Sequence, residues 1–151
     1  MDKLNLPEYD LQIRREGDGA LSVYDILRRK YVALTPEEWV RQHFVHYLVE
    51  EKGYPSALMA NEVSIKLNGT SRRCDTVVYD RSGKPMMIIE YKAADINITQ
   101  AVFDQIVRYN MVLQVRYLIV SNGIRHYICA IDYERASYSF LRDIPEYENR
   151  E

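Results

Sequence analysis

Four successive apolar residues, Met86 to Ile89, constrain this chain more than any other stretch. A strand that is apolar on both faces is typical of a sheet interior that is covered on both sides. Residues 100–113 follow with the spacing of an amphipathic helix, and the apolar run Tyr117–Ser121 comes next. A strand, a crossover helix and a second strand form a right-handed unit in which the two strands are parallel. This part of the sequence therefore predicts an α/β fold.

The flanking segments add antiparallel strands and a further helix. Thr35 is expected to cap a helix that continues to about Glu51, with Pro36 at its first position and Glu38 closing a capping box. The helix at 100–113 is expected to have Asn97 or Thr99 as its cap. The other predicted elements are a β-hairpin around Gly17-Asp18-Gly19, a short extended piece at 31–34, strands at 62–67, 74–79, 86–92 and 124–131, and an irregular tail from residue 142.

These elements predict one α/β domain over residues 1–151, with a mixed central sheet flanked by helices and an N-terminal β-hairpin. Residues 1–34 are expected to form the hairpin extension, residues 35–133 the core, and residues 134–151 a C-terminal tail. A chain of 151 residues is long enough to bury a hydrophobic core without disulfides.

Composition and charge narrow the choice of environment and partner. The two cysteines form no C-x-x-C pair, which indicates a reducing compartment. The charged N-terminus excludes a signal peptide, and no apolar run approaches the roughly 20 residues of a membrane span. We therefore expect a cytoplasmic protein without a membrane segment. A net charge of −2 gives no general attraction for a polyanion, so nucleic-acid binding would require local clusters such as Arg72-Arg73, which could equally be solvated side chains.

A hairpin register brings three charged residues together. If the turn between the strands at 74–79 and 86–92 is centred on Ser82-Gly83, Asp75 lies opposite Glu90 and Arg73 lies opposite Lys92. Opposed residues of an antiparallel pair point to the same side of the sheet. Lys92 shares this side with Glu90 because the two are separated by one residue, whereas the side chain of Tyr91 points the other way.

Two carboxylates that face each other repel, and either a proton or a cation must relieve the repulsion. Mg²⁺, a hard ion that prefers oxygen ligands, could be held by Asp75 and Glu90, with the backbone carbonyl of Tyr91 as a third ligand. Such an ion activates a bound water for phosphodiester attack, and Lys92 could orient or deprotonate that water. The alternative is that Asp75 and Glu90 only form salt bridges with Arg73 and Lys92 across the hairpin.

The wider sequence resembles a known family. The segments that carry the likeness are Arg72-Arg73-Cys74-Asp75-Thr76-Val77-Val78-Tyr79-Asp80, Gly83-Lys84-Pro85 and Ile88-Ile89-Glu90-Tyr91-Lys92-Ala93. The likeness extends upstream to Thr35-Pro36-Glu37-Glu38 through Gly53-Tyr54-Pro55, and downstream to Tyr117-Leu118-Ile119-Val120-Ser121-Asn122-Gly123. Together they resemble the nuclease core of the PD-(D/E)XK superfamily, and more narrowly the N-terminal domain of type I restriction enzyme R subunits. The resemblance implies a restriction-endonuclease-like fold and catalytic roles for Asp75, Glu90 and Lys92. Cys74 departs from the family pattern, since it stands where the superfamily name has proline.

Five further residues are candidates for the same site. Gln105 and Tyr109 lie four apart on one helix face and match a Q-x-x-x-Y motif, which by resemblance supports the active site and the DNA. An ordinary amphipathic helix is the alternative, and Arg108 beside them is a candidate phosphate contact. Glu38 could supply a third acid to the metal or serve only the capping box. Glu62 is a weaker candidate for the same role.

The leading hypothesis is therefore an Mg²⁺-dependent (or Mn²⁺-dependent) DNA endonuclease of the restriction type. A non-cleaving nucleic-acid-binding or assembly module of a restriction-modification complex is the alternative from another class, and a structural domain with a cross-strand ion network is the third. Expected partners are DNA, restriction-system subunits and a second copy of the chain. No G-x-x-x-x-G-K-[ST] motif occurs, so we expect no nucleotide-driven motor in this sequence.

Overall fold

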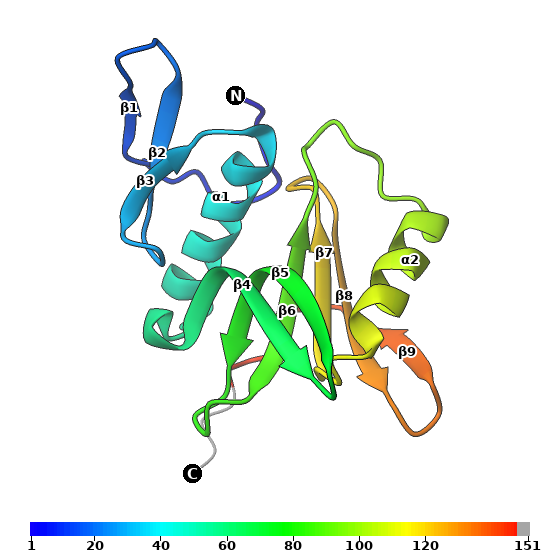
Figure 1. Cartoon of the computed structure of the whole chain (residues 1–151). Helices are drawn as coiled ribbons and strands as arrows, with labels where there is room; N and C mark the ends of the chain where they lie inside the picture. The colour runs from blue at the N-terminus through cyan, green and yellow to red at the C-terminus, as the bar shows by residue number, and fades with distance from the viewer. Residues whose placement is uncertain (148–151) are drawn as a thin grey trace.

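The computed structural model describes residues 1–147, which form two sheets and two α-helices (Figure 1). The strands of the smaller sheet are β1 (Ile13–Arg15), β2 (Leu21–Asp25) and β3 (Lys30–Ala33). The larger sheet has the order β4 (Met59–Leu67), β5 (Thr70–Tyr79), β6 (Pro85–Tyr91), β7 (Tyr117–Ser121), β8 (His126–Asp132) and β9 (Ser137–Phe140). The helices are α1 (Pro36–Glu50) and α2 (Gln100–Met111), with a short 3-10 turn at Ser56–Leu58.

The larger sheet is mixed, as predicted. Strands β6 and β7 are parallel and are joined through α2, whereas every other neighbouring pair is antiparallel. Each predicted core strand is present, although β4 begins three residues and β5 four residues before the predicted start. The α/β class and the mixed sheet flanked by helices are confirmed.

Helices α1 and α2 cover opposite faces of this sheet. Val40, Phe44 and Leu48 of α1 pack in one buried cluster with Met87 and Ile89 of β6. Ile88, which lies between them in the strand, packs in a second cluster with residues of α2, as strand alternation requires. Strand β6 is therefore buried from both sides, and the apolar run that identified it from the sequence is explained.

Strand β9 corrects the prediction of a C-terminal tail from residue 134. Residues 137–140 pair with β8, with Phe140 opposite Cys129. The rings of Tyr138 and Phe140 lie 5.4 and 5.1 Å from the ring of Phe103 on α2, so aromatic packing holds this short strand on the sheet. The irregular segment that follows also packs against the domain, because the Tyr147 hydroxyl donates to the carbonyl of Tyr79.

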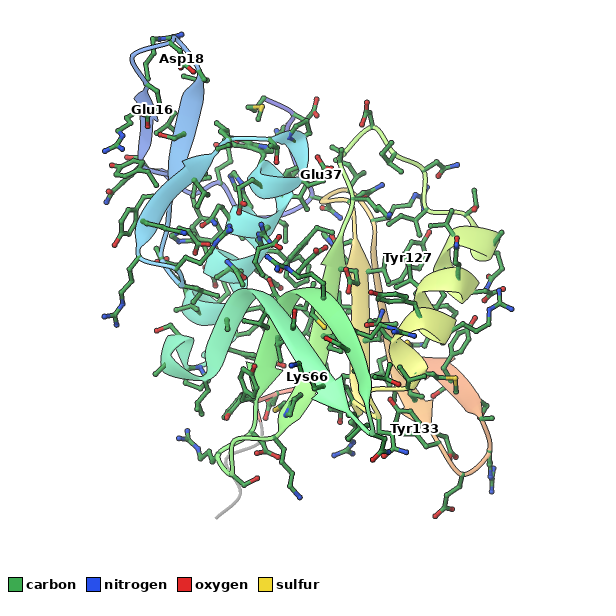
Figure 2. All side chains as sticks on the ribbon, in the orientation of Figure 1. Glu16, Asp18, Glu37, Lys66, Tyr127 and Tyr133 are labelled. Carbon is green, nitrogen blue, oxygen red and sulfur yellow. The ribbon has the colours of Figure 1, made fainter. Side chains whose placement is uncertain are left out.

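The N-terminal hairpin is confirmed and is larger than predicted, because the extended piece at 31–34 forms β3 and pairs with β2. Glu16 and Asp18 lie at its protruding tip (Figure 2). The inner end is anchored, since the fully buried Asp25 accepts hydrogen bonds from the backbone of Leu27 and from the amide of Asn61 on β4. The small sheet is thereby joined to the core by buried polar contacts.

The two helix starts are capped by threonines. The side chain of Thr35 accepts from the Glu38 amide at 3.0 Å, and that of Thr99 accepts from the Val102 amide at 3.2 Å. The predicted return contact of the capping box is wrong, because the Glu38 carboxylate accepts from side chains of other residues instead. No helix within residues 1–147 is long and apolar enough to cross a membrane.

Candidate active site

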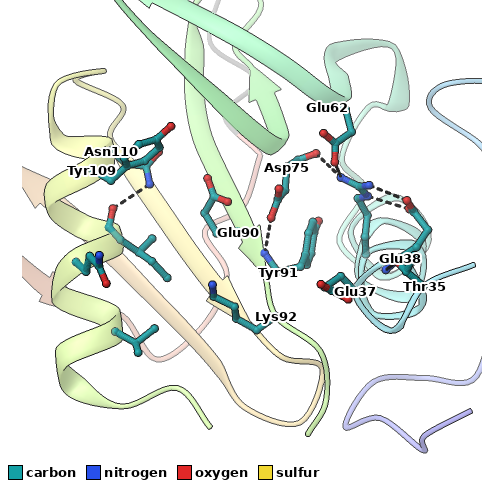
Figure 3. Close-up of a pocket in the computed structure, with 14 residues that line it drawn as sticks. Thr35, Glu37, Glu38, Glu62, Asp75, Glu90, Tyr91, Lys92, Tyr109 and Asn110 are labelled. Atoms are coloured by element: carbon teal, nitrogen blue, oxygen red, sulfur yellow. Dashed lines mark hydrogen bonds and ion pairs between the residues drawn. The ribbon is translucent and has the colours of Figure 1, made fainter. Parts of the chain in front are cut away.

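A cavity of about 620 Å³ opens at the C-terminal end of β6, between α1 and α2 (Figure 3). It collects nearly all the candidate residues that the sequence suggested. The residues that line it are Thr35, Glu37, Glu38, Arg41, Glu62, Asp75, Glu90, Tyr91, Lys92, Val102, Gln105, Ile106, Tyr109 and Asn110.

The strand register that places Asp75 beside Glu90 is the one predicted from the sequence. Thr76 lies opposite Ile89, so the next position of each strand holds Asp75 and Glu90. Both side chains line the cavity, and the Tyr91 amide donates to Asp75 Oδ2 at 2.9 Å. The Tyr91 ring points away, since its hydroxyl donates to the buried Thr76 on the other side of the sheet. Two acids and Lys92 therefore meet on one wall.

A β-bulge produces this register. On the turn side Tyr79 lies opposite Pro85, and the pairing shifts by one residue between Val78 and Tyr79. Without the shift Asp75 would lie opposite Ile89, and every side chain of one strand would exchange faces. The bulge is therefore a requirement for the site.

The Glu90 carboxyl is in an unfavourable environment for a charge. Burial, followed by the neighbouring charge of Asp75, raises the pKa of Glu90 to about 9, although Lys92 acts in the opposite direction. Its Oε1 atom is buried and has no hydrogen-bond partner among the described residues. An unpaired buried oxygen of this kind needs an explanation, such as an ion or a water.

The predicted alternative, salt bridges across the hairpin, is not what residues 1–147 show. Arg73 pairs with Glu62, with Nη2 3.0 Å from Oε2. Strand β6 ends at Tyr91, and the Lys92 amide donates to the carbonyl of Ser121 on β7. Neither Asp75 nor Glu90 has an ion-pair partner within 4.0 Å in this part of the chain.

Glu38 lies in the cavity wall but is already fully engaged. Both its oxygens accept from Arg41, and they also accept from Arg28 and Gln42, at distances of 2.7–2.9 Å. Burial would raise the pKa of Glu38, but hydrogen bonds from Arg41 and Gln42 lower it below its usual value. Glu38 therefore holds arginines in place, and we do not retain it among the proposed metal ligands.

Arg41 is the residue that sequence reasoning missed. It is buried, and its Nη1 donates to Glu62 Oε1 at 2.8 Å and to the backbone carbonyl of Asp75 at 3.0 Å. It thereby joins α1 to the strand that carries Asp75. The spacing of Glu38 and Arg41 on one turn of the helix was the available signal, but it does not indicate which strand the pair contacts.

Glu62 reaches the cavity through a left-handed backbone conformation, with φ 55° inside β4. Left-handed backbone costs an L-residue about 1 kcal/mol or more and is free for glycine.

Glu62→Gly and Glu62→Ala both remove the carboxylate that Arg41 and Arg73 contact. We therefore expect the glycine variant to exceed the alanine variant by about 1 kcal/mol in free energy of unfolding, measured in urea. The reverse order, which is normal for a regular strand, would show that this conformation is not present in solution.

Gln105 and Tyr109 face the cavity from α2. Tyr109 is 46% exposed, and the Arg72 guanidinium lies 4.6 Å from the centre of its ring. Arg72 Nε also donates to the Tyr109 carbonyl at 3.1 Å, so the β4–β5 hairpin contacts α2 here. Arg108 is exposed and is not part of the cavity wall.

Within residues 1–147, no three or more His, Cys, Asp or Glu side chains are grouped so that they could hold a metal ion. The oxygen donors that the cavity offers are the carboxylates of Asp75 and Glu90 together with backbone and amide oxygens nearby. This donor set suits a hard cation that keeps part of its water shell, and it does not suit zinc.

The sequence model of one protein family, the type I restriction enzyme R protein N terminus, matches residues 36–145. The chain belongs to this family. The matched region begins at α1, includes β9 and contains every cavity residue except Thr35. The family region therefore extends past residue 133, where the core was predicted to end, and excludes the small N-terminal sheet.

One solved structure supports the fold of this R N-terminal domain. It is a fragment described as a candidate HsdR subunit of a type I restriction enzyme from Vibrio vulnificus YJ016, with a TM-score of 0.51 and 20% sequence identity. The match covers 76% of this chain and 24% of that one, so the present chain spans about a quarter of the length of its structural relative. No curated protein sequence matches the chain significantly.

Proposed function

We propose that this domain hydrolyses DNA phosphodiester bonds as a divalent-cation-dependent endonuclease of a restriction system. The observation that carries the proposal is the state of Glu90. Its carboxyl is buried beside a second acid, and one of its oxygens has no partner in the described residues. A structural strand would gain stability from an apolar residue at this position, so the acid requires a functional reason.

The residues present fit Mg²⁺ or Mn²⁺. Asp75 and Glu90 would hold the ion, and the Tyr91 carbonyl would be a third ligand. The N–H and C=O of a strand residue point to the same neighbouring strand, and the Tyr91 N–H points at Asp75 Oδ2. When bound, the cation would polarise a phosphate oxygen and activate a water.

The chain's own groups have separate tasks in this proposal. Lys92 Nζ would orient the attacking water by donating a hydrogen bond to it, and its positive charge would stabilise the negative charge that builds on the phosphate. Asp75 is fixed by two hydrogen bonds: the Tyr91 amide donates to its carboxylate, and Arg41 donates to its backbone carbonyl. Gln105 and Tyr109 line the opposite wall, where they would contact the DNA strand next to the cleaved bond.

The partners follow from family membership as proposals. We propose that the domain acts on DNA together with other subunits of a restriction system, and that a second copy of the chain would be needed to cut both strands. The domain division is proposed as an N-terminal extension over residues 1–34 and a nuclease core that, with β9, extends to about residue 145.

Cleavage of supercoiled plasmid tests the proposal. We expect nicking or linearisation that requires Mg²⁺ or Mn²⁺ and falls at least about 1000-fold in Asp75→Asn and Lys92→Ala, because each removes a group the reaction needs. Asp95→Asn, an exposed acid outside the cavity, is the matched control and should cut like the wild type.

The outcomes separate the two leading functions. Absence of cleavage combined with absence of divalent-cation binding in calorimetry would overturn the enzyme proposal. Salt-dependent DNA binding without cleavage would instead support the non-cleaving module of a restriction complex.

A further inference from the structure

Asn110 is the buried polar residue of the cavity that has no role so far. It lies on α2, is 2% exposed and lines the cavity wall. Its Oδ1 atom is buried and has no hydrogen-bond partner among the described residues. Figure 3 shows Asn110 on the helix that faces Glu90 across the cavity.

The orientation of the Asn110 amide follows from its one hydrogen bond. Nδ2 donates to the carbonyl of Ile106 at 2.9 Å. A carbonyl can only accept, so the nitrogen must be the atom that faces the helix backbone. The oxygen of the same amide therefore points away from the helix, and it presents an acceptor without a donor.

The position is one where an apolar residue would be expected. Phe103, Val107 and Asn110 are the buried residues of α2, and their spacing is that of a single apolar stripe. Asparagine is a weaker helix former than leucine, and burying an unpaired acceptor opposes folding. Asn110 is thus a polar residue in an otherwise apolar stripe of α2, as Glu90 is a polar residue at the end of the apolar strand β6.

Glu90 and Asn110 both line the same cavity. Among residues 1–147, four side-chain atoms are buried without a partner, and two of them, Glu90 Oε1 and Asn110 Oδ1, belong to residues that line this cavity. Segments that are distant in the sequence each supply one unsatisfied oxygen. Oxygens of carboxylates and amides are ligands and hydrogen-bond acceptors for hydrated hard cations.

We infer that Asn110 Oδ1 is a further oxygen donor of the divalent-cation site, opposite the Asp75–Glu90 pair. This inference rests on the proposed function, because it assumes that the cavity receives a cation. It gives α2 a role in cation binding through Asn110, in addition to the proposed DNA contact through Gln105 and Tyr109. It also explains why a buried helix position carries an amide.

Two substitutions of opposite character test the assignment. Asn110→Leu keeps the volume and removes the oxygen, and Asn110→Asp keeps an oxygen and adds charge. We expect Mn²⁺ affinity, measured by calorimetry at pH 8, to fall about tenfold in Asn110→Leu and to rise several-fold in Asn110→Asp, since outer ligands and ligand charge both tune affinity. Asn97→Leu makes the same change at an exposed position outside the cavity and should bind like the wild type.

Thermal unfolding without added cation separates a binding role from a structural one. Asn110→Leu should be at least as stable as the wild type, because it removes an unpaired buried oxygen. Equal or tighter Mn²⁺ binding by Asn110→Leu would overturn the inference while leaving the Asp75–Glu90 site intact. A wild type that binds no Mn²⁺ would overturn the proposed function as well.

Discussion

Replacing Arg41 with methionine will lower the free energy of unfolding by about 3–5 kcal/mol, because it leaves a buried carboxylate without its main partner. The Glu38 side chain is 6% exposed and receives two of its hydrogen bonds from Arg41. Methionine retains most of the apolar stem, so the loss reports chiefly on the guanidinium. Urea denaturation at pH 7 followed by circular dichroism measures the change.

The matched control uses the other arginine that contacts Glu62. The Arg73 side chain is 62% exposed, and exposed pairs contribute about 0–1 kcal/mol, so Arg73→Met should change stability little. The double variant Glu38→Gln/Arg41→Met should recover part of the loss, because it removes the buried charge together with its partner. If Arg41→Met costs no more than Arg73→Met, Arg41 does not hold the site together.

The same substitution should affect the proposed chemistry. Arg41 donates to the Asp75 carbonyl, and its loss frees the part of β5 that presents the Asp75 carboxylate. A catalytic carboxylate works only when its position is held within a fraction of an ångström. Arg41 is therefore a positioning residue in the proposed mechanism, since it contacts the backbone of Asp75 and not the carboxylate.

The larger sheet and its central strand β6 were predictable because local sequence patterns specify them. Met86 to Ile89 is apolar at every position, which is typical of a strand covered on both faces. The threonine caps of both helices are local too, since each needs only one side chain and the amide three residues later. The Asp75–Glu90 pairing was predicted from an assumed turn centre, and the structure reaches the same pairing through a bulge after Val78.

The remaining features depend on contacts between distant segments. Strand β9 was missed because Tyr138 and Phe140 find their partner, Phe103, on a helix more than thirty residues earlier. The capping-box interpretation of Glu38 was wrong because arginines compete for its carboxylate, and one of them, Arg28, comes from the segment next to β2. These contacts join segments that are far apart in the sequence, and no local sequence pattern specifies them. The residues that support the site from behind were therefore not predictable.

Glu90→Gln will stabilise the cation-free domain at alkaline pH and remove its stabilisation by Mg²⁺. The folded domain holds the Glu90 proton up to a pKa of about 9, whereas the usual value is 4.5. Because the folded state binds this proton more tightly, its contribution to stability is fully present below pH 4.5 and is lost as pH rises toward 9. Glutamine imitates the protonated acid at every pH, so the variant does not suffer this loss.

The difference in free energy of unfolding between wild type and Glu90→Gln reports the titration of Glu90 alone, because the other titrating groups are present in both proteins. Between about pH 5 and 8 the wild type should lose roughly 1 kcal/mol per pH unit relative to the variant. At pH 8, saturating Mg²⁺ should raise the stability of the wild type by about 2–3 kcal/mol, as a ligand at 100 times its Kd does, and should leave the variant unchanged. Thermal and urea unfolding at each pH, with and without Mg²⁺, give both quantities.

Glu134→Gln is the control, because Glu134 is exposed in the turn between β8 and β9 and does not line the cavity. Its difference from the wild type should stay constant across this pH range, and Mg²⁺ should stabilise it as much as the wild type. A Glu90→Gln difference that does not change with pH would mean that the carboxyl is solvated in solution. Equal Mg²⁺ stabilisation of wild type and Glu90→Gln would mean that the cation binds elsewhere, since a ligand that Glu90 helps to hold must lose affinity when the carboxylate is removed.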